Sequence, residues 1–128
     1  MDGQRRLTLV VCDDDDSVRQ IVGIVARGVG YEVVGEAATA VDAEQLVAAA
    51  KPHVLVLDLA LRGMSGLDVI APLRAAAPET TIIVFTAFDT MGGLAHRSGA
   101  FAVVRKDEPG KLEDALQRAR ATSRAVLP

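Results

Sequence analysis

The sequence predicts an α/β fold, a single doubly wound (βα)5 domain, from three observations. Five short apolar runs alternate with longer segments in which apolar residues recur every three or four positions. Several of the runs are continuously apolar, as strands covered on both faces must be. The 128 residues are enough for one hydrophobic core but not for two. We therefore expect residues 1–128 to form one domain, with a five-stranded parallel sheet between two layers of helices.

The apolar runs are the predicted strands. Each has six or seven residues, an ordinary strand length, and contains at least two Val or Ile residues, which favour β structure. In chain order the predicted strands are Leu7–Cys12, Tyr31–Ala37, His53–Asp58, Thr81–Ala87 and Ala100–Lys106.

Helices are predicted between the strands, where apolar residues form stripes of helical period. The clearest stripes lie within Val18–Val29, Leu46–Ala50 and Leu112–Ala119. Asp89–Ser98 is the weakest predicted helix, because its two adjacent glycines each cost about 1 kcal/mol of helix stability relative to alanine. Residues suited to helix ends flank these segments, namely Thr39 with Asp42, Ser65 with Asp68, Pro109, Gly30 and Gly99.

Composition excludes several classes of protein. The net charge of -3 and the 50% apolar content argue against disorder and against a nucleic-acid-binding surface. No apolar run reaches the roughly 20 residues of a membrane span, and the opening residues are too few and too polar for a signal peptide. Cys12 is the only cysteine and lies inside an apolar run, which favours a buried thiol in a reducing compartment. We expect a cytoplasmic protein.

Polar residues follow four of the predicted strands. Asp13 and Asp14 follow the first, Asp58 closes the third, Thr86 lies at the end of the fourth and Lys106 at the end of the fifth. Ligands of open α/β sheets bind beyond the carboxyl ends of the strands, so these five side chains should meet at one edge of the sheet.

Crowded carboxylates at this edge would repel one another unless a cation neutralised them. Three carboxylates without a histidine or cysteine cluster favour a hard ion such as Mg²⁺. The metal would leave positions open for phosphate oxygens, and Asp58 could then act as a nucleophile toward a phosphoryl group. Thr86 and Lys106 would hold the transferred oxygens.

Plainer interpretations exist for each of these residues. Asp15 and Asp16 are typical of a helix N-terminus, where a carboxylate caps the first turn and complements the helix dipole. Taken singly, Asp58 suits a turn, Thr86 an ordinary strand and Lys106 a solvated charge. Gly63 and Gly66 suit either a simple turn or a backbone that approaches a phosphate, and both interpretations stay open. His53 and His96 are isolated in the sequence, so we expect them at the surface.

The motifs together resemble the receiver domains of two-component response regulators. They are CDDDDSVR after the first strand, VLVLDLALRGMSGLDVI around the third, VFTAF at the fourth and GAFAVVRKD at the fifth, in the right order and spacing. The resemblance extends from about Arg6 to Arg124. It implies a flavodoxin-like fold with strand order 2-1-3-4-5, and a signalling switch that accepts phosphate from a histidine kinase.

The resemblance also implies a role for each site residue. Asp58 would be the phosphoacceptor, with Thr86 and Lys106 on the phosphoryl oxygens. Asp14 would bind Mg²⁺ directly and Asp13 largely through water. The full set of metal ligands would be Asp13, Asp14, Asp58 and the backbone carbonyl of Ala60.

Three positions depart from the family pattern. Arg62 stands where the loop after the phosphoacceptor usually has proline, which removes a rigid residue and adds a charge. Val103 replaces the usual aromatic of the fifth strand, so switching through a rotating ring is not expected. Asp107 replaces a common proline after Lys106, so we expect no cis peptide there.

The resemblance implies partners rather than a separate substrate. These are a sensor histidine kinase or phosphotransfer protein, and an output protein or domain that contacts Asp89–Ser98, the last strand and the final helix. The resemblance also allows a homodimer, whereas direct nucleic-acid binding and membrane contact are not expected. The domain would catalyse only its own phosphorylation and dephosphorylation, either as a stand-alone regulator or as the N-terminal part of a longer one.

Two other functions compete with this interpretation. An Mg²⁺-dependent phosphohydrolase would also use an aspartate nucleophile after a strand, but it generally has a second aspartate two residues later, where this chain has Ala60. A degenerate receiver acting only as an interaction module would have lost an acidic residue or the lysine, and none is lost.

Overall fold

The predicted α/β fold is confirmed by a computed structural model, which describes residues 6–61, 64–65, 67–87 and 92–126. Its main sheet has five parallel strands in the order β2-β1-β3-β6-β7. Counted along the chain without the two short strands β4 and β5, this is the expected order 2-1-3-4-5. The strands are β1 (Leu7–Cys12), β2 (Tyr31–Ala37), β3 (Val54–Leu57), β6 (Thr81–Thr86) and β7 (Ala102–Arg105).

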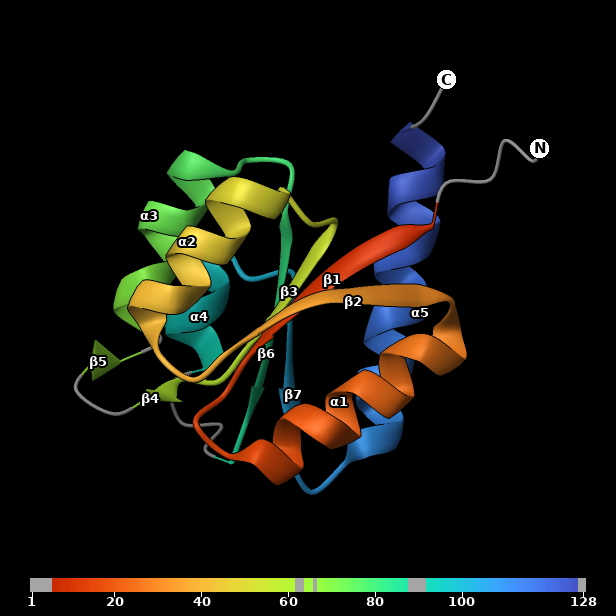
Figure 1. The fold of residues 1–128 in the computed structure, drawn as a ribbon, viewed down its shortest axis with the longest axis horizontal. Helices are drawn as coiled ribbons and strands as arrows, with labels where there is room; N and C mark the ends of the chain where they lie inside the picture. The colour runs from red at the N-terminus through yellow and green to blue at the C-terminus, as the bar shows by residue number, and fades with distance from the viewer. Residues whose placement is uncertain (1–5, 62–63, 66, 88–91, 127–128) are drawn as a thin grey trace.

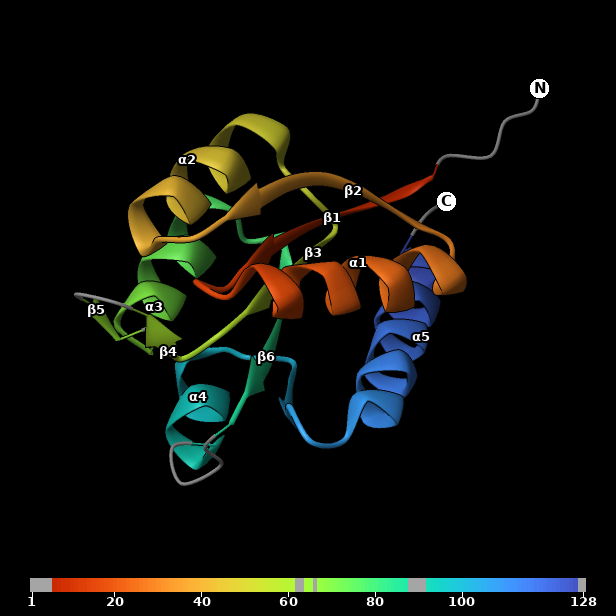
Figure 2. The same ribbon diagram turned by 60° about the horizontal axis from the view of Figure 1, so that its bottom comes forward.

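Helices cover both faces of this sheet, as the continuously apolar strands require. Figures 1 and 2 show α1 (Asp16–Val29) and α5 (Pro109–Val126) on one face. The other face carries α2 (Ala40–Ala50), α3 (Leu67–Ala76) and α4 (Gly92–Ser98). One hydrophobic cluster fills the space under each helix layer. All four residues of β3 and five of six in β6 are buried, so the central strands form the middle of the core.

Local signals predicted several helix ends correctly. Asp15 is the N-cap of α1, and its carboxylate accepts a hydrogen bond from the backbone N–H of Ser17 at 2.8 Å. Thr39 caps α2 in the same way through the N–H of Asp42. Gly30 ends α1 with φ of 101°, a left-handed conformation that favours glycine. The described part of the fourth helix is Gly92–Ser98, and the predicted start at Asp89 falls in residues 88–91, which lie outside the described residues.

A short ladder after β3 was not predicted. Here β4 (Ala60–Leu61) pairs antiparallel with β5 (Met64–Ser65) through two residue pairs. Gly63, Gly66 and Arg62, for which the sequence analysis offered interpretations, lie outside the described residues, as does the Ser65 side chain.

His53 is not the isolated surface residue that the sequence suggested. It lies just before β3 and is half-buried, and its ring Nδ1 is 3.0 Å from the backbone nitrogen of Thr8. Its own N–H donates to the carbonyl of Thr8 at 3.0 Å. The histidine therefore joins the starts of β1 and β3, a long-range contact that no local pattern encodes.

Tyr31 offers a test of the packing under α5. The residue is 2% exposed, and its hydroxyl donates to the carbonyl of Leu116 at 2.9 Å. Burial raises the pKa of Tyr31 to about 12. Because the folded pKa lies above the ordinary value of 10, folding loses stability as the pH rises from about 10 through about 12.

We expect the phenolate absorbance of the native protein to develop near pH 12. Tyr31 is the only tyrosine and the chain has no tryptophan, so the signal has one source. Removing the hydroxyl in Tyr31→Phe should cost about 1 kcal/mol of unfolding free energy. Ionisation near pH 10, while circular dichroism still reports a folded chain, would contradict the burial of this ring.

Candidate functional site

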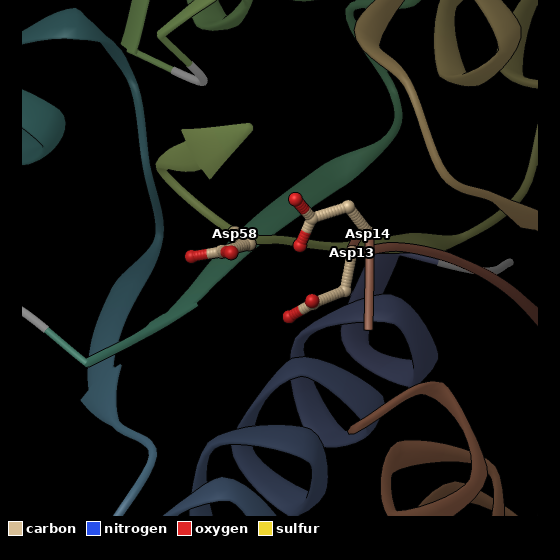
Figure 3. Close-up of side chains that lie close together, drawn as sticks. All are labelled: Asp13, Asp14 and Asp58. Atoms are coloured by element: carbon tan, nitrogen blue, oxygen red, sulfur yellow. The ribbon is translucent and has the colours of Figure 1, made fainter. Parts of the chain in front are cut away.

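Three aspartates meet at the carboxyl edge of the sheet. Asp13 and Asp14 directly follow β1, and Asp58 directly follows β3. One carboxylate oxygen of each lies within 4.8 Å of those of the other two, and Figure 3 shows the three side chains gathered together. Asp13 and Asp58 are only 2% and 3% exposed, whereas Asp14 is half-buried. The predicted convergence of strand-end carboxylates is therefore present.

Backbone hydrogen bonds that continue the sheet beyond the strands position these residues. The N–H of Asp13 donates to the carbonyl of Ala37 at 3.0 Å, and the N–H of Asp58 donates to that of Cys12 at 3.0 Å. The Asp13 carboxylate also accepts the N–H of Asp15 at 2.9 Å. Register between parallel strands thus determines where the carboxylates lie.

Lys106 contacts two of the three carboxylates. It follows β7, where its N–H donates to the carbonyl of Thr86 at 2.9 Å. Its Nζ lies 2.7 Å from Asp13 and 3.2 Å from Asp58. The sequence suggested a lysine for phosphoryl oxygens but did not predict this pairing. The ammonium group already supplies part of the positive charge that the buried carboxylates need.

Burial and charge oppose each other in this cluster. Burial raises the pKa of the Asp13 carboxyl, and the hydrogen bond from Lys106 offsets only part of that effect. For Lys106, burial alone lowers the pKa, but the hydrogen bond to Asp13 and the charge of Asp58 outweigh it, so the pKa is raised. The lysine is therefore held in its charged form. An additional cation near Asp13 would favour its ionised form as well.

Cys12 lies behind the cluster as a packed core thiol, as the sequence suggested. The side chain is buried, and Sγ lies 3.5 Å from the carbonyl of Thr39. Burial, with the charges of Asp13 and Asp58, raises the pKa of the thiol to about 12. A thiol held in its protonated form is a poor metal ligand, so the candidate ligands at this edge are oxygens.

The other predicted site residues lie close by. Thr86 is fully buried at the end of β6, and Ala60 is exposed at the start of β4. The N–H of Ala60 donates to Oδ1 of Asp58 at 3.2 Å, which orients the carboxylate. A metal contact from the Ala60 carbonyl and phosphoryl contacts from Thr86 stay predictions.

Two of the three positions that depart from the family pattern, Val103 and Asp107, lie within the described residues. Val103 is half-buried in β7, opposite Val84 of β6, and packs against the core under α2 to α4. Asp107 accepts two hydrogen bonds from the Arg105 guanidinium, at 3.1 and 2.8 Å. No cis peptide bond occurs among the described residues, in agreement with the expectation after Lys106.

Sequence reasoning gave no role to Arg19. Its guanidinium donates to the carbonyl of Asp13 and contacts the carboxylates of Asp16 and Glu36. The spacing of Asp16 and Arg19, three residues apart in a predicted helix, was a signal for one of these contacts. The contacts to Asp13 and Glu36 depend on the tertiary fold.

The donor set fits Mg²⁺. This ion binds through one or two carboxylates and keeps several waters, and it requires oxygen ligands at short distances. Three carboxylates at one edge, two of them buried, offer such ligands within a small volume. Every buried side-chain oxygen or nitrogen in the described residues has a hydrogen-bond partner, the buried oxygens of Asp13 and Asp58 included.

Comparisons with known proteins identify the family. The family model for the response regulator receiver domain matches residues 9–117. The chain is 37% identical over 127 residues to the DNA-binding response regulator MtrA of Mycolicibacterium smegmatis, covering 97% of this chain and 53% of that protein. It is 36% identical over 107 residues to the oxygen regulatory protein NreC of Staphylococcus epidermidis, covering 80% of this chain and 49% of that protein.

Solved structures agree with this result. A LuxR-family two-component response regulator from Aurantimonas sp. SI85-9A1 superposes with a TM-score of 0.84 at 29% identity, covering 92% of this chain and 87% of that one. The receiver domain of AraT from Geobacillus stearothermophilus shares the fold, with a TM-score of 0.85 at 22% identity, covering 94% of this chain and 98% of that one.

The chain belongs to the receiver-domain family of two-component response regulators. Members of this family are signalling switches that are phosphorylated on an aspartate, and they generally bind Mg²⁺ at an acidic pocket. The chain spans about half the length of the curated relatives it matches.

Proposed function

We propose that residues 1–128 form one receiver domain in which Asp58 accepts a phosphoryl group from a histidine kinase or phosphotransfer protein. The observation that carries this proposal is the cluster of three carboxylates within 4.8 Å, with the Lys106 ammonium between Asp13 and Asp58. The metal ligands in this proposal are Asp13, Asp14, Asp58 and the carbonyl of Ala60. A bound Mg²⁺ would neutralise charge on the phosphoryl oxygens.

The side chains of the site then have separate tasks. The Ala60 N–H holds Oδ1 of Asp58, which leaves Oδ2 as the oxygen nearest the lysine and best placed to attack phosphorus. Lys106 lies 3.2 Å from that oxygen, so its charge is in position for the incoming phosphoryl group without a large movement. The Thr86 hydroxyl, at the end of the adjacent strand β6, would donate a hydrogen bond to another phosphoryl oxygen.

The two competing functions have less support. A phosphohydrolase needs an acid or base two residues after the nucleophile, and the methyl group of Ala60 cannot transfer a proton. A degenerate receiver need not retain three close carboxylates and a charged lysine, and this chain retains all four. Self-phosphorylation and autodephosphorylation are therefore the only reactions that we assign to the domain.

The proposed output surface is formed by α4, β7 and α5. Leu94 of α4 is 46% exposed and would provide an apolar contact for an output protein, an output domain or a second copy of the chain. Because α4 begins with two glycines, its structure should respond to small shifts at Thr86. Switching would proceed through backbone and packing, since Val103 has no ring.

Other assignments concern the setting of the domain. No helix in the described ranges has both the length and the apolar character of a bilayer span. We assign the domain a cytoplasmic location, without direct contact to membrane or nucleic acid, in a regulator that is either stand-alone or longer.

The proposed function is tested by phosphorylation with small donors. With acetyl phosphate or phosphoramidate and Mg²⁺, mass spectrometry should show one added phosphoryl group per chain, located on Asp58. Excess chelator should prevent the reaction because the carboxylates then lack their metal. Equal labelling in chelator, or a phosphoryl group on another residue, would refute the assignment.

A further inference from the structure

Arg19 connects three segments around the metal-binding loop. It lies in the second turn of α1, and its side chain is only 14% exposed. One guanidinium nitrogen donates to the backbone carbonyl of Asp13, and a second contacts the carboxylate of Asp16. The third, Nε, lies 3.2 Å from Oε1 of Glu36 on β2. A single side chain thus ties the loop after β1 to its own helix and to the edge strand.

The carbonyl that Arg19 holds belongs to the peptide between Asp13 and Asp14. The side chains on either side of this peptide supply two of the three carboxylates in the cluster. The N–H of Asp13 is fixed to Ala37, and its carboxylate accepts the N–H of Asp15. Without the Arg19 bond, rotation of this peptide would be less restricted, and the Asp14 carboxylate would change direction with it.

We propose that Arg19 is a positioning residue for the divalent cation, acting through the Asp13–Asp14 peptide. This inference rests on the proposed function, because it presupposes that the cluster binds Mg²⁺. Arg19 is not itself a metal ligand in this role. The carboxylates of Asp16 and Glu36 neutralise and orient its guanidinium.

The charge of Arg19 and its hydrogen bond to the Asp13 carbonyl predict opposite effects on Mg²⁺ affinity. A positive guanidinium close to the site repels a cation, so if only its charge mattered, removing it would strengthen Mg²⁺ binding. If Arg19 instead fixes the peptide, removing it would weaken binding. Partners of metal ligands typically contribute about 10- to 100-fold to affinity.

The experiment is a calorimetric Mg²⁺ titration of the full chain and its Arg19→Gln variant. We expect the variant to bind Mg²⁺ at least about tenfold more weakly. Arg27→Gln is the matched control, because it removes the same charge from an exposed position in the last turn of α1 and should leave the affinity nearly unchanged. Arg19→Lys keeps the charge but lacks the planar fork, and it should also bind more weakly than the wild type.

Equal or tighter binding by a folded Arg19→Gln protein would overturn the inference. If circular dichroism shows that this variant is unfolded, Glu36→Gln replaces it, because Glu36 is exposed on the edge strand and its loss removes only one anchor. The Mg²⁺ affinity of Glu36→Gln should be lower than that of Glu32→Gln, which makes the same charge change on the same strand. Equal affinities of the two variants would overturn the inference. Absence of Mg²⁺ binding in the wild type would instead refute the proposed function.

Discussion

Replacing Asp58 by asparagine is expected to abolish phosphorylation by small donors, with labelling reduced to background. The amide has no anionic oxygen to attack phosphorus. Asp58 is held by the Ala60 N–H on one oxygen and by Lys106 on the other, whereas Asp14 belongs to the neighbouring strand end. Mass spectrometry under the conditions used for the wild type measures the loss.

The fold should survive this change. Asparagine has the same shape as aspartate, and its carbonyl oxygen can still accept the N–H of Ala60. Asp114→Asn is the matched control, because Asp114 is exposed in α5 and lies outside the carboxylate cluster, so its labelling should match the wild type. Labelling of Asp58→Asn at a wild-type rate would show that the nucleophile is another residue.

Lys106→Met is expected to reduce both stability and phosphorylation. Without the ammonium group, Asp13 and Asp58 would stay buried without their shared cationic partner. Removing one member of a buried ion pair costs about 3 kcal/mol of unfolding free energy, and methionine keeps most of the apolar length of the side chain. Urea unfolding in the presence of a chelator measures the loss.

Mg²⁺ should restore part of that stability, because it supplies positive charge to the same carboxylates and binds the native state. Phosphorylation should stay slow even at saturating Mg²⁺, since the metal cannot replace the lysine beside Oδ2 of Asp58. Lys111→Met is the control: this lysine is 68% exposed and pairs with Glu108 at the surface, so its loss should leave the urea midpoint nearly unchanged. If both variants unfold at the same urea concentration, the buried ion pairs do not stabilise the fold.

The strands and the meeting point of the aspartates could be predicted because they depend on local patterns and on one rule of topology. A continuous apolar run such as that of β3 specifies a strand buried on both faces. Parallel strands place their carboxyl ends at one edge, so Asp13 and Asp58 had to be neighbours once the order was known.

Contacts that depend on tertiary geometry could not be predicted in this way. Lys106 and Asp58 are 48 positions apart, and whether a lysine reaches a carboxylate or solvent depends on side-chain direction, which periodicity does not carry. Thr8 and His53 are likewise 45 positions apart. The two-residue ladder of β4 and β5 is too short to produce an alternating pattern, so it has no recognisable signal in the sequence.

The burial of Cys12 has a practical consequence for spectroscopy. Reagents that modify cysteines react with the thiolate, and a thiol with pKa raised to about 12 inside the core offers almost none at neutral pH. The native chain therefore behaves as if it had no cysteine, and a new one at an exposed position such as Leu94 would carry a spin label or fluorophore alone. Labels placed in this way could follow movement of α4 during phosphorylation without altering the carboxylate cluster.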